Sequence, residues 1–535
     1  MPGAGGLLGR RRQRAGAAAV SGGGPHPAAP GSGPPPAGPE DPADSIERNA
    51  AFGLAVKLAG ALFTGALTIF LVRELEPDGY GVFALATSIG SLVVLFSDFG
   101  ISQSAARYIA ERRGRHQEVG NVLGDALSLK LAASLLVSAL LALLAVPIAD
   151  AYDNPDLVWP LRLVSLAVLA QSVMALFAGS FNALGRNSLH FRLALSESAV
   201  EVGASVALVL LGAGVTGAVG GRAIGYAFGA LLGVVLVARL IRPGRMHVGL
   251  RARWGYRPIA AYAGALLIVE GAFALYTEID TLMIGAILGT TAAGLFAAPL
   301  QLLIFTQYPA LALAAGIAPR LARHPDHPPN ADALQGGLRL LILIQFALVV
   351  PIVVWAEPLV DLVFGADYGA SVEPLRFLAP YVLIGGITPL LALSVNYLGE
   401  ARRRIPLAIA TVLINAALDL WLINELGIKG ASIATSIAVA FYAFGHLMIC
   451  VRVLDLRLAP LALSSTRSAL AATAMGAVLF AFGTGTLSVL EMIAGGLLAL
   501  TAYALVLVTT RELTGEDARQ LRERAAAALG RGSGT

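Results

Sequence analysis

The sequence predicts an all-α polytopic membrane protein with about 14 transmembrane helices, and three observations lead to that fold class. Hydrophobic residues make up 56% of the 535 residues and charged residues only 13%, which is about half the charged share of a soluble domain. Apolar segments long enough to cross a bilayer recur along the chain, with the basic residues collected in alternate loops. The chain also repeats its own landmarks at one offset, which predicts two similar halves.

The first 45 residues are a Gly, Pro and Ala tract with a basic cluster at residues 10–14. The tract lacks the apolar core of a signal peptide. It also contains too little apolar surface to offset the entropy of ordering. We therefore expect a disordered cytoplasmic tail, whose arginines are solvated or touch anionic lipid headgroups.

The transmembrane spans follow from length. A bilayer core of about 30 Å needs roughly 20 apolar residues per helix, and this rule divides the chain into fourteen spans. They are 50–71, 81–100, 121–148, 157–184, 190–211, 215–238, 258–286, 292–316, 334–356, 371–397, 405–424, 428–451, 461–483 and 487–510.

The distribution of Lys and Arg predicts the orientation of these spans. One set of alternate loops holds 20 such residues, whereas the other set holds only Arg73 and Lys429. Loops rich in Lys and Arg stay in the cytoplasm. Both chain ends are therefore expected there, in a multi-pass protein of the cytoplasmic (inner) membrane.

An internal repeat appears when the chain is slid against itself by about 214 residues. Pro160-Leu-Arg162 then falls on Pro374-Leu-Arg376 and, with a slip of one residue, Gly81 falls on Gly294. Spans 1–6 thus map onto spans 7–12. Because six helices return the chain to its starting side, we expect two parallel six-helix lobes related by a pseudo-two-fold axis along the membrane normal, with a cleft between them.

The last two spans lie outside the repeat, as an added C-terminal helix pair. The expected parts are a disordered tail (1–45), a first lobe (46–241), a basic cytoplasmic linker (242–257), a second lobe (258–452), transmembrane helices 13–14 (453–511) and a cytoplasmic tail (512–535).

Ionisable residues at membrane depth are the candidate functional residues, because burying one costs about 3 kcal/mol. Lys57 and Glu270 lie mid-way along spans 1 and 7, at nearly equivalent places in the repeat. We expect both to face the cleft, where Lys57 would bind an anionic group and Glu270 would be its partner in the empty protein. The alternative is a structural ion pair or snorkelling to the headgroups. Lys130, deeper in span 3, is a second candidate ligand for an anionic group.

Glu197 and Glu201 are four residues apart in span 5, so they share one helical face. Two close carboxylates resist carrying charge together, which suits a proton carrier. The alternative is that both hydrogen-bond within a polar lobe interior. We expect Arg222, Glu278, Asp280 and Asp419, which fall close to the outer ends of spans, to face the headgroups.

Span 6 carries a glycine at every fourth position, which predicts close static packing against another helix. The alternative is a surface on which helices slide as the lobes rock. The glycines are Gly217, Gly221, Gly225, Gly229 and Gly233.

Several kinds of chemistry are not expected. The single cysteine, Cys450, excludes a disulfide framework and a thiolate cluster, so we expect no metal or other cofactor. No glycine-rich stretch has the Gly-x-x-x-x-Gly-Lys pattern of a phosphate loop. The basic loops adjoin membrane spans and are topology signals, so nucleic acid is not an expected partner.

Several short motifs resemble the polysaccharide biosynthesis (oligosaccharide flippase) family of the multidrug/oligosaccharidyl-lipid/polysaccharide exporter superfamily. They are Arg-Glu-Leu-Glu-Pro-Asp-Gly-Tyr-Gly at 73–81, Asp-Phe-Gly at 98–100, Phe-Gly at 364–365 and the segment 427–435. These are mostly turn and packing positions. The resemblance covers about residues 46–452.

The resemblance implies a transporter, not an enzyme. It would flip an oligosaccharide on a polyprenyl-diphosphate carrier from the inner to the outer leaflet by alternating access, for assembly of cell-surface or extracellular polysaccharide. Lipid-linked oligosaccharide and membrane lipids would then be its partners, with a polysaccharide polymerase and glycosyltransferases as further ones. A cation-coupled multidrug exporter of the same superfamily is the alternative. A membrane glycosyltransferase or polymerase is a distant one, because the longest outer loop, about 357–370, is short.

Overall fold

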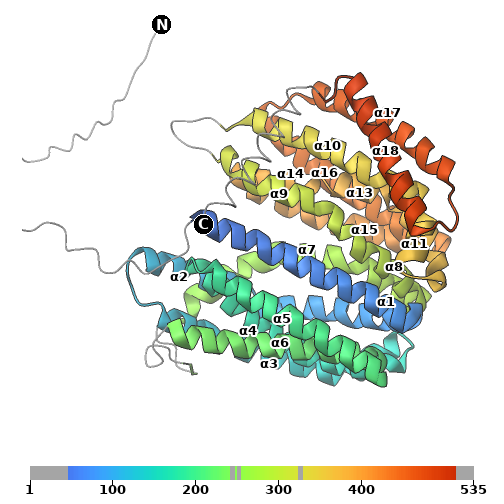
Figure 1. Cartoon of the computed structure of the whole chain (residues 1–535). Helices are drawn as coiled ribbons and strands as arrows, with labels where there is room; N and C mark the ends of the chain where they lie inside the picture. Colours follow the sequence, from blue (N-terminus) through green and yellow to red (C-terminus); the bar gives the residue numbers. More distant parts are fainter. Residues whose placement is uncertain (1–45, 241–247, 250–254, 323–328, 514–535) are drawn as a thin grey trace, which may run out of the picture. The chain divides into compact units, whose positions relative to one another are not determined.

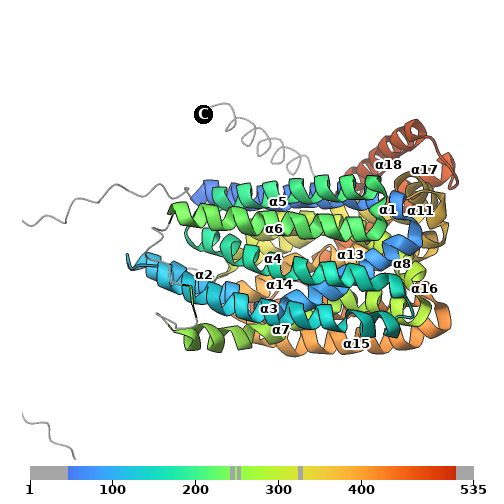
Figure 2. The same ribbon diagram turned by 90° about the horizontal axis from the view of Figure 1, so that it is seen from below.

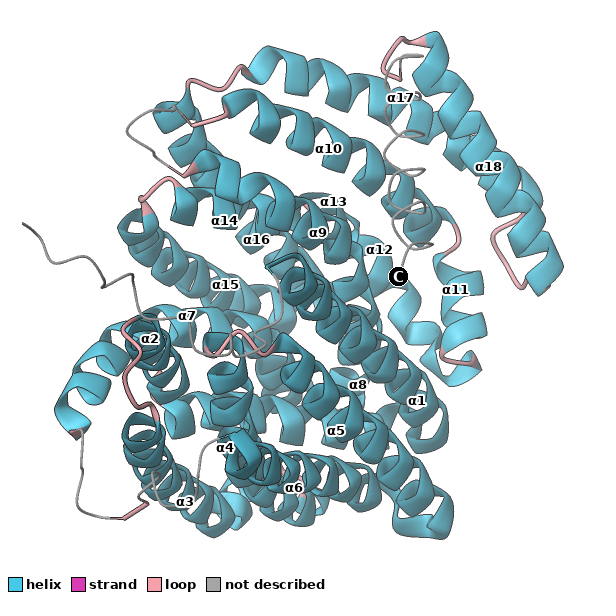
Figure 3. Ribbon diagram, turned by 60° about the vertical axis from the view of Figure 1, so that its left-hand side comes forward, coloured by secondary structure: helices cyan, strands magenta, loops and turns pink. Residues whose placement is uncertain are grey.

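The computed structural model describes residues 46–240, 248–249, 255–322 and 329–513, and this part of the chain contains helices and no strands (Figure 3). The all-α class is therefore confirmed. The predicted N-terminal tail, most of the linker and almost all of the C-terminal tail lie outside the described residues.

The first half of the chain forms a bundle of long helices (Figure 1, blue to green). They run roughly parallel in the view from below (Figure 2). Their bounds are α1 Ile46–Asp98, α2 Ile101–Gly114, α3 Gly120–Ala151, α4 Val158–Ala183, α5 Asn187–Leu208 and α6 Gly214–Leu240.

The second half forms a bundle beside the first and is more interrupted (Figure 1, light green to orange). Its helices are α7 Tyr256–Leu288, α8 Thr290–Leu303, α9 Tyr308–Ile317, α10 Ala331–Val354, α11 Ala356–Val363, α12 Val372–Phe377, α13 Ala379–Gly385, α14 Thr388–Tyr397, α15 Arg404–Leu426 and α16 Ile428–Leu454. Short turns join several of them: η1 Pro155–Leu157 and η2 Val209–Ala213 in the first half, then η4 Ile304–Gln307, η5 Ala318–Leu321, η6 Ala366–Ser371 and η7 Ala401–Arg403.

The last two helices, α17 Leu458–Phe482 and α18 Val489–Thr509, lie at the edge of the second bundle beside α10 (Figures 1 and 3). Two polar groups fix them there. The Trp355 indole, just after α10, donates to the Leu479 carbonyl at 3.1 Å, and the Tyr503 hydroxyl donates to the Leu343 carbonyl at 2.7 Å.

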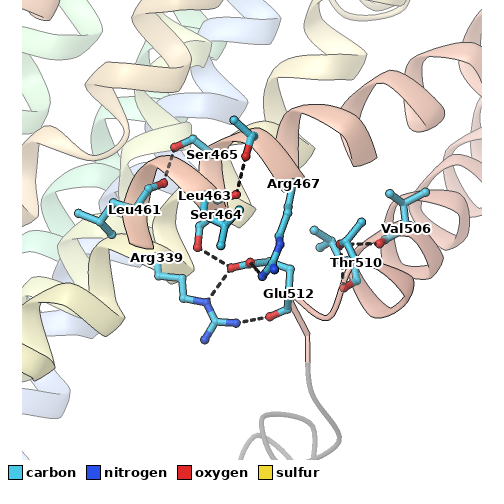
Figure 4. Close-up of polar contacts among 11 residues, drawn as sticks. Arg339, Leu461, Leu463, Ser464, Ser465, Arg467, Val506, Thr510 and Glu512 are labelled. Atoms are coloured by element: carbon cyan, nitrogen blue, oxygen red, sulfur yellow. Dashed lines mark hydrogen bonds and ion pairs between the residues drawn. The ribbon is translucent and has the colours of Figure 1, made fainter. Parts of the chain in front are cut away.

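Glu512, just after α18, links the end of α18 to α10 and α17 (Figure 4). Although it belongs to the expected C-terminal tail, it is only 1% exposed. Its carboxylate accepts from Arg339 of α10 at 2.7 Å, and from Ser464 and Arg467 of α17 at 2.6 and 3.1 Å. Burial alone would raise the pKa of the Glu512 carboxyl, but these hydrogen bonds outweigh burial and hold that pKa below its usual value.

Eleven helical stretches in the described part of the chain are long and apolar enough to cross a membrane. Two of them, Ala51–Asp98 and Asn187–Leu240, have 48 and 54 residues, more than twice the roughly 20 residues that a bilayer requires. Each contains a break. Glu76, which precedes a proline, has φ 56° and ψ 175°, and Gly212 has φ 89°. The breaks fall where the sequence separates spans 1 from 2 and 5 from 6.

The glycines of α6 lie close to neighbouring helices, as their spacing predicts, and all five are buried. The first four lie against α5, and Gly233 lies against Phe177 of α4. A Cβ placed on Gly217 would lie 3.0 Å from Leu208, and one on Gly225 would lie 2.6 Å from the Cβ of Glu201. As the glycine number rises, the partner number falls, so α5 and α6 form an antiparallel hairpin.

Two spans that the sequence predicts as continuous are broken in the structure. The segment 292–316 is interrupted by η4, and the segment 371–397 divides into α12, α13 and α14. The buried Gln345 amide donates to the Thr306 carbonyl at 2.8 Å and to the Gly386 carbonyl at 3.4 Å. A broken helix leaves carbonyl groups without helical partners, and a neighbouring polar side chain can satisfy them away from water.

Candidate functional site

A cavity of about 610 Å³ lies between the first bundle and the start of the second. Side chains from both parts of α1, from α4, α5 and α6, and from α7 and α8 line it. Polar groups are frequent in this lining, which is unusual inside an apolar membrane bundle. They include Thr64, Thr87, Ser91, Gln171, Ser198 and Gln301.

The carboxylates of Glu197 and Glu201 meet the cavity from α5, as expected from their shared face. Arg222 of α6 lies beside them, with its Nε 3.7 Å from Glu201 Oε1. Arg222 also donates to the Tyr226 hydroxyl at 3.4 Å. Glu197 is 5% exposed; its Oε2 accepts from Ser198 at 3.1 Å, while its buried Oε1 has no partner among the described residues.

Glu278 of α7 brings a third carboxylate to the cavity. The side chains of Ser88 and Ser91, both on the second part of α1, lie close to it. Headgroup contact was the expectation for Arg222 and Glu278, and it is wrong for both. The sequence placed them near span ends, but in the structure Arg222 pairs with Glu201 and both Arg222 and Glu278 line the cavity.

A second polar centre, which the sequence did not predict, lies inside the second bundle. Asp280 and Asp419 are 3% and 0% exposed, so the expectation that they face the headgroups is also wrong. The Asn415 amide donates to Asp280 at 2.5 Å and to Asp419 at 2.6 Å. The Thr435 hydroxyl donates to Asp280 at 2.5 Å.

Geometry explains how this centre forms. Glu278 and Asp280 are two residues apart on α7, so they point about 200° apart around the helix axis. One faces the cavity and the other faces the interior of the second bundle. Asn415 and Asp419 share one face of α15, four residues apart, and this spacing was the signal in the sequence. Two buried carboxyls around one amide cannot both stay ionised unless a cation lies between them. Otherwise one of the two must hold a proton.

Lys57 is an exposed residue of α1. It precedes the cavity residue Thr64 by seven positions, two helical turns, and therefore lies on the same face about 10 Å from it along the axis. The side chain of Glu270 lies outside the described residues, so its pairing with Lys57 stays a prediction.

Lys130 does not line the cavity. Its ammonium group is 0% exposed and forms an ion pair with Asp98. It also donates to the Ser102 hydroxyl at 2.9 Å, and that hydroxyl donates to Asp98 at 2.7 Å. Lys130 thus ties α3 to the junction of α1 and α2, and a phosphate group could reach it only if the pair with Asp98 opened.

The two bundles meet tightly at one end of the cavity. Gly81, next to the cavity residue Tyr80, lies against the backbone of Thr290 and Gly294, while Gly294 lies against the backbone of Pro77 and Gly81. Polar contacts surround this crossing. The Asp78 carboxylate accepts from Thr290 at 2.6 Å and from Thr291 at 3.0 Å.

Arg73, three residues before the break in α1 at Glu76, reaches across to the end of α11. It donates to the backbone carbonyls of Val363, at 3.0 Å, and of Leu362. These contacts close the cavity at the end where the chain breaks at Glu76.

Comparison with known proteins gives a family and a fold. The model of the family described as "Polysaccharide biosynthesis protein" matches residues 46–324, more than half of the chain. A Shigella flexneri protein named as an O-antigen transporter is 21% identical over 408 residues, covering 74% of this chain and 95% of that protein. A Haloferax volcanii protein named as a low-salt glycan biosynthesis flippase, Agl15, is 22% identical over 393 residues, covering 72% of this chain and 79% of that protein.

Solved structures share the fold. The lipid II flippase MurJ in an inward closed conformation matches with a TM-score of 0.68 and 13% identity, over 86% of this chain and 99% of that one. An inward-facing multidrug transporter of the MATE family, from the MOP superfamily, matches with a TM-score of 0.56 and 17% identity, over 76% and 95%.

Proposed function

The chain belongs to the polysaccharide biosynthesis protein family, and from this premise we propose that it is a transporter that flips a lipid-linked oligosaccharide across the cytoplasmic membrane. The observation that carries the proposal is the polar cavity of about 610 Å³ within an apolar bundle, closed at one end by contacts between the two bundles. The named relatives are an O-antigen transporter and a glycan flippase, and neither name describes an enzyme.

We propose fourteen spans, in two parallel six-helix lobes and a C-terminal helix pair. The two long stretches would each cross the membrane twice, because they break at Glu76 and Gly212, and α7 would add one more span. The contact between Gly81 and Gly294 supports the pseudo-two-fold axis. Its partners, Thr290 and Pro77, precede the two glycines by the same four residues, as expected where a contact lies on a two-fold axis.

Transport would follow alternating access. In the present conformation the contacts of Arg73, Asp78 and Gly81 seal one end of the cavity. We propose that this sealed end is on the outer side of the membrane and that both termini are in the cytoplasm; the distribution of Lys and Arg between alternate loops supports this orientation. Substrate would enter from the cytoplasmic end, and release would require the two lobes to separate at the sealed end.

The polyprenyl-diphosphate carrier needs a cation. We propose that Lys57, exposed on the cavity-facing side of α1 toward its N-terminal end, meets the diphosphate, with Glu270 as its partner before substrate binds. An ammonium group on this face can attract a diphosphate without being buried itself. Lys130 would contribute only in a conformation in which its pair with Asp98 opens.

Coupling to a proton gradient is proposed at Glu197 and Glu201, where the unpartnered Glu197 oxygen can take up a proton. Asp280 and Asp419 are a second candidate coupling site, because two buried carboxyls there share one amide donor.

A cation-coupled multidrug exporter is the second candidate function. The three carboxylates in the cavity favour it, since they would attract an organic cation. The likeness to the MATE transporter is one of fold.

The deciding experiment is transport by the purified full chain in proteoliposomes. One set is supplied with a fluorescent lipid-linked oligosaccharide and a second set with a fluorescent cationic drug. We expect the glycolipid to reach the opposite leaflet faster than in protein-free vesicles, and the drug not to accumulate. Drug uptake without glycolipid flipping would replace the first function by the second.

A further inference from the structure

We propose that the cavity binds the glycan part of the substrate and selects uncharged or amino-bearing sugars over acidic ones. This inference rests on the proposed flipping function and adds the class of sugar to it. It follows from the charges of the cavity, from its hydrogen-bonding groups and from the position of Lys57, which lies outside the cavity on the same face of α1 as Thr64.

The charge of the lining is negative. Glu197, Glu201 and Glu278 bring three carboxylates, and Arg222 brings the one guanidinium among the described lining residues. Arg222 is already engaged, since it pairs with Glu201 at 3.7 Å and donates to Tyr226 at 3.4 Å. If Glu197 and Glu201 share a proton, the lining still carries more negative than positive charge. Between charges surrounded by protein, like-charge repulsion is stronger than in bulk water.

The hydrogen-bonding groups suit a polyol. A sugar hydroxyl is both a donor and an acceptor, and the lining offers hydroxyl and amide groups that are also both, such as Thr64, Gln171 and Gln301. The carboxylates add strong acceptors for hydroxyl or ammonium donors. One of these acceptors is unsatisfied in the structure, because the Glu197 Oε1 atom is buried and has no partner among the described residues. A ligand that donates a hydrogen bond there would remove the cost of leaving it unsatisfied.

The size of the cavity is also suitable. Its volume of about 610 Å³ falls within the range of roughly 300–1,000 Å³ that is typical of small-ligand sites. It can therefore hold part of an oligosaccharide while the lipid chain stays in the bilayer.

The diphosphate is expected to stay outside this cavity. Inside, it would face the three carboxylates with only an engaged guanidinium to balance it. Lys57 lies about 10 Å along α1 from Thr64, on the same helix face, and is exposed. The sugar thus binds in the acidic cavity, and the diphosphate binds at Lys57 outside it. A uronic acid or other acidic sugar would have to enter the acidic part.

The test uses the full-length protein in proteoliposomes with two fluorescent polyprenyl-diphosphate oligosaccharides. They differ only at one sugar, glucose in one and glucuronic acid in the other, so that a single carboxylate distinguishes them. Flipping is measured as the appearance of labelled glycan at the opposite face of the vesicle. We expect the neutral compound to flip about ten-fold or more faster than the acidic one.

A charge variant sharpens the test. Glu278→Gln removes one carboxylate from the cavity and keeps the shape of the side chain. We expect it to raise the flipping rate of the acidic compound relative to the neutral one. Glu425→Gln, a matched change at an exposed residue outside the cavity, should leave the ratio unchanged. Thermal unfolding of each variant shows whether it is folded.

The outcomes separate the two proposals. A neutral preference that shrinks in Glu278→Gln supports the inference. Equal flipping of both compounds, or a preference for the acidic one, overturns the inference and leaves the flippase function standing. Flipping of neither compound by a folded wild-type protein overturns the proposed function itself.

Discussion

Gly81 and Gly294 pack against each other so closely that neither has room for a side chain. A Cβ on Gly81 would lie 3.0 Å from the Gly294 nitrogen and closer still to the Thr290 carbonyl, and a Cβ on Gly294 would lie 2.9 Å from the Gly81 nitrogen. Both obstacles are backbone, which cannot move aside as a side chain can. This crossing therefore holds the two bundles together at the sealed end of the cavity.

Substitution of either glycine tests the crossing. We expect Gly81→Ala or Gly294→Ala to weaken closure by about 1–3 kcal/mol, because overpacking forces the helices apart. Closure can be followed with a disulfide between Asp78→Cys and Thr291→Cys, since the natural Cys450 is buried. We expect the two introduced cysteines to cross-link faster in the protein that keeps both glycines than in either glycine variant.

Gly203→Ala is the matched control for this change. Gly203 lies in α5 with open space around its missing Cβ. Alanine there should stabilise the helix by up to about 1 kcal/mol and leave cross-linking unchanged. Equal cross-linking in all four proteins would show that the crossing does not control closure.

Lys57→Ala is expected to reduce flipping of the glycolipid without unfolding the protein, because Lys57 is exposed. Loss of one charge-assisted contact to phosphate corresponds to roughly a ten-fold or larger drop in rate. Lys57→Arg, which keeps the charge, should restore most of the rate. Lys429→Ala is a control at an exposed lysine that pairs with Glu373. Full export by Lys57→Ala would remove Lys57 from the substrate site.

Lys130 and Asp98 should behave as a structural pair. Lys130→Met leaves the Asp98 carboxylate without its cation and is expected to lower the free energy of unfolding by about 3 kcal/mol. In the double variant Lys130→Met/Asp98→Asn the uncompensated charge is gone, so stability should recover. We expect flipping to recover with it. Recovered stability without flipping would instead assign Lys130 to the phosphate, as the sequence predicts.

The two carboxylate centres can be separated by their effect on proton coupling. Glu201→Gln keeps the side-chain shape but cannot exchange a proton, so flipping should run at the same rate with and without an imposed proton gradient. Asp419→Asn removes one of the two carboxyls that share the Asn415 amide and should keep the gradient dependence. The reverse pattern would place coupling at Asp280 and Asp419.

Glu512 gives a pH-dependent contribution to stability. The pKa of its carboxyl is lowered from 4.5 in the folded protein, so the ionised form is favoured by folding. The contribution is complete above pH 4.5 and is lost as the pH falls through the lower, folded-state value. We expect the unfolding temperature in detergent to fall between pH 5 and about 3.

Glu512→Gln should lower the unfolding temperature at neutral pH and flatten its acid dependence. Loss of the charge-assisted hydrogen bonds to Arg339 and Arg467 corresponds to about 1.5–3 kcal/mol. Glu425→Gln, at an exposed position, controls for the loss of a charge alone. An unchanged acid dependence in Glu512→Gln would show that another group produces it.

Part of the site could be predicted from residue spacing. The four-residue spacing of Glu197 and Glu201 places both on one face of α5, and the structure brings both to the cavity. The four-residue spacing of the α6 glycines predicts the close packing with α5 that the structure contains. In both cases helix geometry relates residues on one element, and a single sequence carries that information.

The sequence by itself determined the all-helical membrane class and the faces of individual helices, because bilayer thickness and helix periodicity act on residues close together in the chain. Only the tertiary structure decided which faces meet. Asp280 and Asn415 are 135 residues apart, and Lys130 meets Asp98 from a different helix. The breaks in 371–397 also depend on Gln345 from α10. Burial of a polar group depends on its partners across the bundle, and no local periodicity records those partners.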